Sequence, residues 1–280
     1  MTMSEIFCNT FKALRHELGH DRLRDTRPMW QRRLSADSDF CRAMVACGYL
    51  TREQMLRAVQ RYWLGRSRDG GVIFWQIDQL GQIFDGKIMH YRPDGHRDHD
   101  RKPTWVSSAL KRHYLKDEEQ QAIEIPSQHC LFGTHLLSEE FLDEPSGKAE
   151  RRVKSEEFLC KQSVLKKRLA APVVVVEAEK TAVILSEVYP EYLWLAAGGL
   201  YELTAAKLFP LRGRRIILFP DTDTDGRAFS TWYRVMLEAQ RLLGQPIHLS
   251  PLLEQKATPD QKRRKIDLID YLIESDVDND

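Results

Sequence analysis

The sequence is poor in the features that define several large protein classes. It holds five cysteines (Cys8, Cys41, Cys47, Cys130 and Cys160) with no CxxC pair and no regular spacing, so neither a disulfide framework nor a zinc ribbon is expected. Its longest apolar stretch, around 172–176, is far shorter than the roughly 20 residues that span a bilayer. The N-terminal segment lacks the basic start and apolar core of a signal peptide. We therefore expect a reduced, cytoplasmic protein with no membrane segment.

The chain also has almost no net charge and no nucleotide-motor motif. Its 42 Lys and Arg residues balance 41 Asp and Glu residues, which leaves a formal charge of +1 and excludes a polycationic DNA-coating protein. Hydrophobic residues make up 42% of the chain, enough for a packed core. The sequence contains no GxxxxGK[ST] motif, so we expect no P-loop helicase within it.

The pattern of residues changes along the chain and predicts four regions. Residues 1–64 favour helices, at about 6–18 and within 38–64, where Thr51 and Gln54 form a capping-box pattern. Residues 65–137 include VIFWQID and GKIMHY, which predict an antiparallel β-meander, followed by a polar loop and a short helix at 107–115. Residues 138–171 are charged and predict a helical connection. Residues 172–280 are predicted to form a further domain.

Strands and helices alternate in this last region, which predicts a doubly wound parallel sheet. The protein as a whole is thus expected to be α/β, with an N-terminal α+β part. The continuous apolar run PVVVV is typical of a strand buried on both faces. We expect strands at 172–176, 192–196, 215–219 and 246–250, and helices at 180–189, 200–209, 227–243 and about 265–274.

Acids and glycines follow three of the four predicted strands. Ligands of open parallel sheets gather at the carboxyl ends of the strands, so these residues are expected to meet at one edge. Carboxylates placed together there, with the rest of the shell left to water and phosphate, are typical of a Mg²⁺ site. Glycines let the backbone approach a phosphate and open a following helix. The residues are Glu177, with Lys180 close behind it, then Gly198 and Gly199, and finally Asp221, Asp223 and Asp225.

Each of these motifs also has a plain structural explanation. Asp-x-Asp after a strand often forms a turn or caps a helix, Gly-Gly often forms a turn, and Glu177 could cap the helix that follows it. Only their combination favours a functional site. The segment DTDTDG also matches the start of a calcium-binding EF-hand loop, but its twelfth position would be Trp232 where a bidentate Glu is required. An aspartate-nucleophile phosphatase would carry its Asp-x-Asp on the first strand, not the third.

The segments VVVVEAEKTA, LAAGG, IILFPDTDTDG and KIDLIDYLI together resemble the Toprim domain of primases and topoisomerases, over about residues 170–275. The similarity is greatest to primase-like proteins of bacterial mobile elements. The resemblance implies that Glu177 is the general acid or base and that Asp221 and Asp223 bind Mg²⁺ or Mn²⁺. Asp225 has no fixed role in that pattern and could assist the metal. Ala178 stands where primases usually carry glycine.

The preceding β-rich region more loosely resembles the N-terminal subdomain of the primase polymerase core. Residues 86–116 carry eight Lys or Arg against three Asp, with Tyr91 and Trp105 interleaved. Cations with aromatics suit a single nucleic-acid strand, through phosphate contact and base stacking. A solvated loop with two core aromatics explains the same pattern equally well. The candidate nucleic-acid-binding residues are Lys87, Arg92, Arg97, Arg101, Lys102, Trp105, Lys111 and Arg112.

These observations lead to one leading hypothesis and two alternatives. The leading hypothesis is a primase-like enzyme of mobile-element replication that uses single-stranded DNA and nucleoside triphosphates, with Lys180 helping a phosphate. A separate helicase or zinc-binding protein would supply the parts that the chain lacks. The first alternative is a Toprim nuclease. The second is a catalytically weak DNA-binding accessory protein, favoured by Ala178, by the missing zinc ribbon and by the near-neutral charge.

Overall fold

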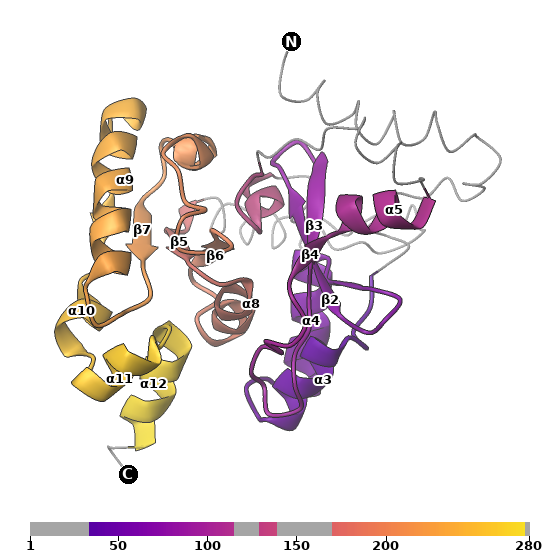
Figure 1. The fold of residues 1–280 in the computed structure, drawn as a ribbon. Coiled ribbons are helices and arrows are strands. Elements are labelled where there is room, and N and C mark those ends of the chain that lie inside the picture. Colours follow the sequence, from indigo (N-terminus) through magenta and orange to yellow (C-terminus); the bar gives the residue numbers. More distant parts are fainter. Residues whose placement is uncertain (1–33, 115–128, 139–169, 278–280) are drawn as a thin grey trace, which may run out of the picture. The chain divides into compact units, whose positions relative to one another are not determined.

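The computed structural model describes residues 34–114, 129–138 and 170–277. The chain divides into two compact units, Met1–Cys130 and Leu131–Asp280. Each unit contains its own four-stranded sheet, antiparallel in the first and parallel in the second (Figure 1). The predicted helix at about 6–18 and nearly all of the predicted connection at 138–171 lie outside the described residues. No helix in the described ranges is long and apolar enough to cross a membrane.

In its described residues the first unit combines three helices with the antiparallel sheet, whose strand order is β1-β2-β3-β4. The predicted β-meander is therefore confirmed. The capping box at Thr51 is also confirmed, since its hydroxyl accepts the Gln54 N–H and the Gln54 side chain accepts the Thr51 N–H. The elements are α3 (Asp39–Ala46), α4 (Arg52–Tyr62), β1 (Gly65–Arg66), β2 (Val72–Ile77), β3 (Ile83–Met89), β4 (Thr104–Trp105) and α5 (Val106–Tyr114).

The helices before residue 65 pack onto this sheet, although we predicted separate regions with a boundary at 64/65. Phe40 of α3 contacts Phe74 of β2 edge-to-face, with ring centroids 5.4 Å apart. The N–H of Asp39 bonds the carbonyl of Gly70, in the turn before β2, at 2.9 Å. Helix α3 and strand β2 both direct apolar side chains toward the interior of the unit. Each element therefore covers the apolar face of the other.

A buried carboxyl group, that of Asp85, joins the sheet to α5. Asp85 is fully buried on β3, and its carboxylate accepts the N–H of Gly86 at 2.7 Å, the N–H of Ser107 at 3.1 Å and the Ser107 hydroxyl. It thereby caps the first turn of α5. Burial raises the pKa of Asp85, although these hydrogen bonds oppose the shift.

Gly86 packs directly against its neighbours on β2. A Cβ at this position would lie 2.6 Å from Cγ2 of Ile73 and 2.7 Å from Cε3 of Trp75. Trp75 is fully buried, so its ring cannot move aside without disturbing the core.

The second unit is built on the parallel sheet, with strand order β6-β5-β7-β8. The predicted positions of the four strands and of the helices at 180–189 and 227–243 are confirmed to within a few residues. The elements are η2 (Thr134–Leu137), β5 (Val173–Val176), α8 (Glu179–Val188), β6 (Leu193–Ala196), η4 (Ala206–Leu211), β7 (Ile216–Phe219), α9 (Arg227–Leu243), β8 (His248–Leu249), α10 (Leu252–Lys256), α11 (Pro259–Arg264) and α12 (Leu268–Val277).

The PVVVV run forms β5, between β6 and β7, and all four of its valines are at most 2% exposed. Helices cover both faces of the sheet: α8 crosses from β5 to β6 and packs against α12, whereas α9 crosses from β7 to β8 in the opposite direction and packs against η4. Right-handed crossovers that run in opposite directions place their helices on opposite faces. The arrangement is therefore doubly wound, as predicted.

Residues 131–137 belong to this second unit, not to the β-rich region in which we placed them. Phe132 forms an antiparallel bridge to Ala196 of β6, with backbone N–H···O distances of 2.9 and 3.1 Å. The outer edge of β6 offers backbone groups that no neighbouring strand pairs, and Phe132 satisfies those of Ala196.

The predicted helix over 200–209 is wrong. Residues 199–205 form turns, and only a 3₁₀-helix, η4, follows. The carbonyl of Leu200 accepts the indole N–H of Trp232 at 3.1 Å, and the carbonyl of Glu202 accepts Lys207 Nζ at 2.7 Å. In an α-helix these two carbonyls would accept backbone N–H groups. Here they accept hydrogen bonds from side chains.

Candidate functional site at the carboxyl edge of the parallel sheet

The strand order places one crevice at the carboxyl edge of the sheet. From β5 the chain crosses to β6 on one side, and from β7 it crosses to β8 on the other, so the direction reverses between β5 and β7. Ligands of open parallel sheets bind at such a switch point. Val176 of β5 is in register with Phe219 of β7. Glu177 comes directly after the first of these strands, and Asp221 lies two residues after the end of the second. The sequence-predicted site therefore has its first two carboxylates at the expected place.

Asp221 lies in a negative electrostatic environment. Burial raises the pKa of Asp221 well above its ordinary value, and the charge of Glu177 raises it further. Asp267 and Asp270 act in the same direction, and Lys180 opposes them. Each negative neighbour disfavours ionisation of Asp221, so a cation bound here would be favoured by all of them.

Asp267 and Asp270 are site residues to which sequence reasoning gave no role. Asp267 directly precedes α12, and its Oδ1 accepts the N–H groups of Ile269 at 2.8 Å and Asp270 at 3.0 Å. The Asp270 carboxylate in turn accepts the Asp267 N–H at 3.3 Å. Burial and the charge of Asp267 raise the pKa of Asp270, and Lys180 lowers it. In the sequence, the two acids lie in KIDLIDYLI, a segment that contributes to the Toprim resemblance, and their spacing at a helix start is typical of a cap.

Asp223 does not join Glu177 and Asp221, contrary to our prediction. Its carboxylate faces the start of α9 and accepts three backbone N–H groups, from Asp225 at 3.0 Å, Arg227 at 2.9 Å and Ala228 at 2.8 Å. Partial burial raises the pKa of Asp223, but these hydrogen bonds outweigh it and hold the pKa below its ordinary value. The plain structural explanation of the Asp-x-Asp motif, a helix cap, therefore accounts for its second acid.

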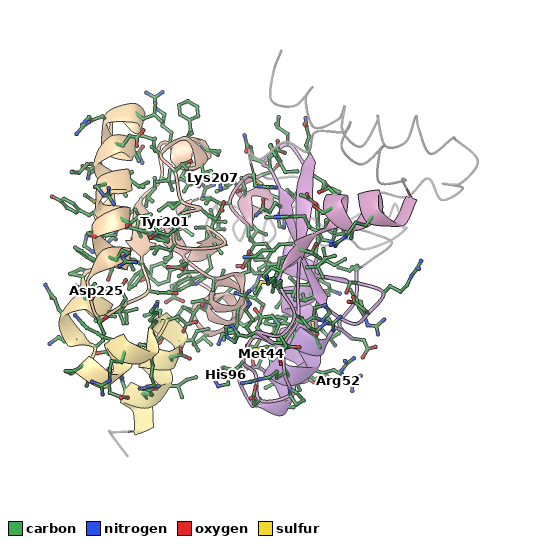
Figure 2. The ribbon with its side chains drawn as sticks, in the orientation of Figure 1. Met44, Arg52, His96, Tyr201, Lys207 and Asp225 are labelled. Carbon is green, nitrogen blue, oxygen red and sulfur yellow. The ribbon has the colours of Figure 1, made fainter. Side chains whose placement is uncertain are left out.

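Asp225, labelled beside α9 in Figure 2, is exposed and forms a 3.5 Å ion pair with Arg227. Both side chains are more than 60% exposed, so this pair contributes little to stability. The predicted assistance of Asp225 to a metal finds no support in these contacts.

Gly198 and Gly199 end β6 at the same edge. Their φ angles are +95° and +156°, a region that favours glycine. The Gly198 N–H donates to the Glu177 carbonyl at 2.9 Å, which ties the ends of β5 and β6 together. The two glycines do not open a helix as predicted, because the turns that carry Tyr201 follow them (Figure 2). The positive end of a helix is therefore not available to a phosphate at this loop.

The donor set at this edge suits Mg²⁺ bound partly by water and phosphate. Within the described ranges, no three His, Cys, Asp or Glu side chains form a group that could hold a metal ion by themselves. Glu177 and Asp221 can supply two carboxylates. Protein sites for Mg²⁺ commonly use one or two carboxylates and complete the shell with water and substrate phosphates.

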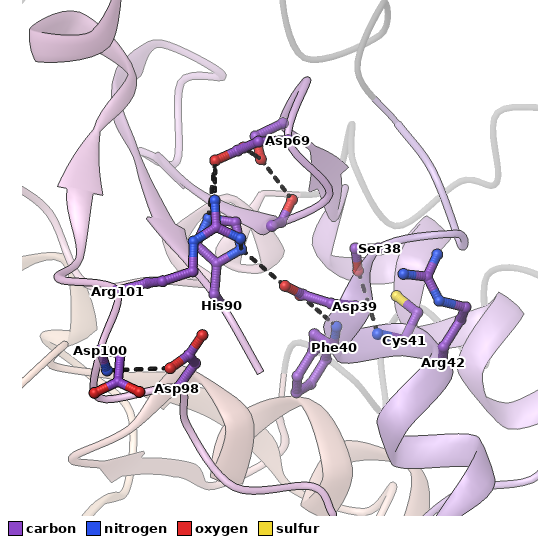
Figure 3. A network of polar contacts seen from close by, with 12 residues as sticks. Ser38, Asp39, Phe40, Cys41, Arg42, Asp69, His90, Asp98, Asp100 and Arg101 are labelled. Carbon is purple, nitrogen blue, oxygen red and sulfur yellow. Dashed lines mark hydrogen bonds and ion pairs between the residues drawn. The ribbon is translucent and has the colours of Figure 1, made fainter. Parts of the chain in front are cut away.

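The candidate nucleic-acid-binding residues of the first unit are largely engaged within the protein. Arg101 contacts Asp69, and its guanidinium lies 2.8 Å from Nδ1 of the buried His90 (Figure 3). His90 also lies 2.9 Å from Asp39 and 3.3 Å from Asp69. Arg101 and His90 together therefore join three segments of the unit: the start of α3, the turn before β2 and the loop after β3.

The other candidate cations differ in their surroundings. Arg92 forms a 2.9 Å ion pair with Asp94, and Arg112 donates to the Thr104 hydroxyl at 2.9 Å. Lys102 is exposed, and Lys87 and Arg97 are half-buried. The side chain of Lys111 lies outside the described residues. The surface on which these cations could contact phosphates is therefore smaller than the eight candidate residues in the sequence suggested.

The two aromatics are at least partly covered. Trp105 stacks on His129, with ring centroids 4.1 Å apart and planes 6° from parallel. Tyr91 is buried against Phe40, so it is a core residue. Only Trp105, which is half-buried, keeps any surface that a nucleotide base could meet.

Fold and site together define a two-unit α/β protein with neighbouring acids at the switch point of a parallel sheet. The chain matches a family model described as a domain of unknown function (DUF6371) over residues 38–145 and 148–222. The match covers more than half of the chain, which therefore belongs to the DUF6371 family. It includes Glu177, Gly198, Gly199 and Asp221. No curated protein matches the chain.

Proposed function

We propose that the protein catalyses Mg²⁺- or Mn²⁺-dependent nucleotidyl transfer on nucleic acid, with a Toprim-like second unit. Primer synthesis from nucleoside triphosphates on single-stranded DNA, in the replication of a mobile element, is the reaction that the sequence resemblance favours. The observation that carries the proposal is the pairing of Glu177 with Asp221 at the switch point. The charge of Glu177 raises the pKa of Asp221, as expected of two carboxylates that share a cation site.

The residues of the crevice have distinct roles in this proposal. Glu177 would take or return the proton of the attacking hydroxyl. Asp221 would bind the metal ion, which supplies electrostatic stabilisation of the charge that develops on the phosphoryl oxygens. Lys180, on the first turn of α8, would orient a phosphate. The backbone at Gly198 and Gly199 allows a close approach of the triphosphate.

A second candidate, a DNA-binding accessory protein of low catalytic activity, is favoured by a specific observation. Asp223 caps α9, and the described residues contain no group of three metal-binding side chains. A site with two carboxylates depends on substrate phosphates to complete the metal shell. Such a site would bind metal weakly without nucleotide.

A primer-synthesis assay on the full chain distinguishes these functions. Wild type, Asp221→Ala and Glu177→Gln are incubated with single-stranded DNA, labelled nucleoside triphosphates, and Mg²⁺ or Mn²⁺. We expect labelled oligonucleotide from wild type and at least a hundredfold less from either variant. Asp225→Asn is the matched control, because Asp225 is an exposed acid of the same loop; this variant should retain activity.

The other outcomes identify the alternatives. Shortened DNA that depends on Asp221 and Glu177 would indicate a nuclease built on the same crevice. DNA binding without synthesis or cleavage, unchanged in both variants, would refute the enzymatic proposal and support the accessory role. Addition of a helicase or a zinc-binding protein from the same element tests whether separate chains stimulate the reaction.

A further inference from the structure

The C-terminal helices α11 and α12 are joined through the carboxylate of Glu274. Arg264 of α11 makes two hydrogen bonds to the Glu274 carboxylate of α12, at 2.7 and 2.8 Å. Gln261 adds a further one to Glu274 at 2.8 Å. These contacts determine how α12 begins relative to α11, and therefore where the segment between them lies.

That segment, Ile266–Asp270, contacts both loops that carry the candidate acids. The Thr181 hydroxyl on the first turn of α8 donates to Asp267 Oδ2 at 2.8 Å. The N–H of Thr222, the residue after Asp221, donates to the Ile266 carbonyl at 3.3 Å. One short segment thus braces the chain just after Glu177 and just after Asp221.

The bond from Thr181 to Asp267 joins two buried groups. Asp267 is fixed by its own cap, because its Oδ1 accepts two N–H groups of α12 while Oδ2 accepts from Thr181. Thr181 and Asp267 are 1% and 8% exposed. A threonine within a helix often bonds a carbonyl of the preceding turn, but here its hydroxyl reaches 86 residues along the chain. A buried bond of this kind restricts the first turn of α8.

We propose that Asp267 is a positioning residue of the crevice: through Thr181 it holds the first turn of α8, and with it Glu177 and Lys180, in register with Asp221. This inference rests on the proposed function and deepens it. Asp267 contacts neither substrate nor metal in this role. Its positioning effect passes through the hydroxyl of Thr181 and is separate from the electrostatic effect of its charge on Asp221.

Thr181→Val tests the inference, because valine has the shape of threonine without the hydroxyl. Binding of Mn²⁺ alone to the full chain is measured by calorimetry, together with the melting temperature. We expect the Kd for Mn²⁺ to rise about tenfold in Thr181→Val, since one buried bond and its partner are lost, and to return to near the wild-type value in Thr181→Ser. Ser186→Ala is the matched control, because Ser186 is a buried hydroxyl on the same helix that donates to the local carbonyl of Val183.

A positioning role and a merely structural role predict different changes in the Kd for Mn²⁺ and in the melting temperature of these variants. Ser186→Ala should lower the melting temperature about as much as Thr181→Val but leave the Kd for Mn²⁺ unchanged. A wild-type Kd in Thr181→Val would overturn the inference while leaving the proposed function intact. If Thr181→Val does not fold, Asp267→Asn is measured in its place, because asparagine keeps an oxygen for the α12 cap; an unchanged Kd there would overturn the inference as well.

Failure of the proposed function has a different signature. A wild-type protein that binds no Mn²⁺, with or without a nucleoside triphosphate, would refute both the metal site and the positioning role. A wild-type protein that binds Mn²⁺ but makes no primer would refute only the proposed reaction.

Discussion

Asp223 is the residue at which two interpretations of the sequence motif make opposite predictions. As a helix cap, its carboxylate satisfies three backbone N–H groups around the start of α9. Removal of a capping side chain destabilises a protein by about 0.5–2 kcal/mol. Asp223 accepts three bonds and lies at the positive end of a 17-residue helix, so we expect Asp223→Ala to cost about 1–2 kcal/mol.

Thermal and urea unfolding measure this loss. Each kcal/mol lowers the melting temperature of a domain of this size by roughly 2–4 °C, so a drop of about 2–8 °C is expected. Because the folded-state pKa of Asp223 lies below its ordinary value of 3.8, its ionised form stabilises the fold at higher pH. That stability is lost as pH falls through the folded-state pKa. The difference between wild type and variant should therefore be full at pH 7 and shrink below pH 3.8.

Two further variants sharpen the test. Asp223→Asn keeps one acceptor oxygen and should lose less stability than Asp223→Ala. Asp225→Ala removes an exposed acid of the same loop and should change stability by less than about 0.5 kcal/mol. If Asp223→Ala unfolds like wild type but no longer binds Mn²⁺, the carboxylate is a metal ligand and our structural reasoning is refuted.

Three other variants test the electrostatics and packing of the two units. Asp85→Asn should stabilise the protein by roughly 1 kcal/mol at pH 7. The raised pKa of Asp85 means that its own contribution to stability is greatest below the ordinary value of 3.8 and is lost as pH rises through the folded-state pKa, a loss that asparagine avoids. Gly86→Ala should destabilise by about 1–3 kcal/mol, because the new methyl would meet Trp75. Asp221→Asn should stabilise the metal-free protein by roughly 1 kcal/mol and abolish the rise in melting temperature on adding Mg²⁺.

Each of these three predictions would be contradicted by a specific result. A gain for Asp85→Asn that did not grow between pH 4 and pH 8 would mean that the buried carboxyl is not the source of the pH dependence. A wild-type melting temperature for Gly86→Ala would show that Trp75 can move aside. If Asp221→Asn still gained stability from Mg²⁺, the ion would bind at another place.

Individual helices and strands could be predicted from short-range patterns in the sequence. The valines of β5 form one apolar run, and Thr51 with Gln54 satisfies the start of α4, so each needs only its own neighbours. The edge of the sheet that holds Glu177 and Asp221 was also predictable, because parallel strands bring their carboxyl ends together. The sequence pattern did not show which of the acids point toward this edge of the sheet.

That decision depends on contacts across long stretches of chain. The spacing of Asp223 to the start of α9 suits both a metal ligand and a cap, and the direction of three backbone N–H groups selects the cap. Asp267 lies 90 residues after Glu177 in the sequence and reaches the crevice only because the contacts between α11 and α12 place it there. The absence of the predicted helix over 200–209 has a similar origin. The carbonyl of Leu200, which would accept a backbone N–H in a helix, accepts the distant indole N–H of Trp232.

The short bridge between Phe132 and Ala196 has a consequence for how the protein behaves in concentrated solution. It pairs the backbone of Ala196 at the end of the outer strand β6, which is four residues long, while the opposite outer strand, β8, is only two residues long. Long uncovered strand edges pair with copies of themselves and aggregate, and this sheet presents little such edge in its described part. A fragment that begins after residue 137 would leave β6 uncovered and should self-associate, which light scattering would detect.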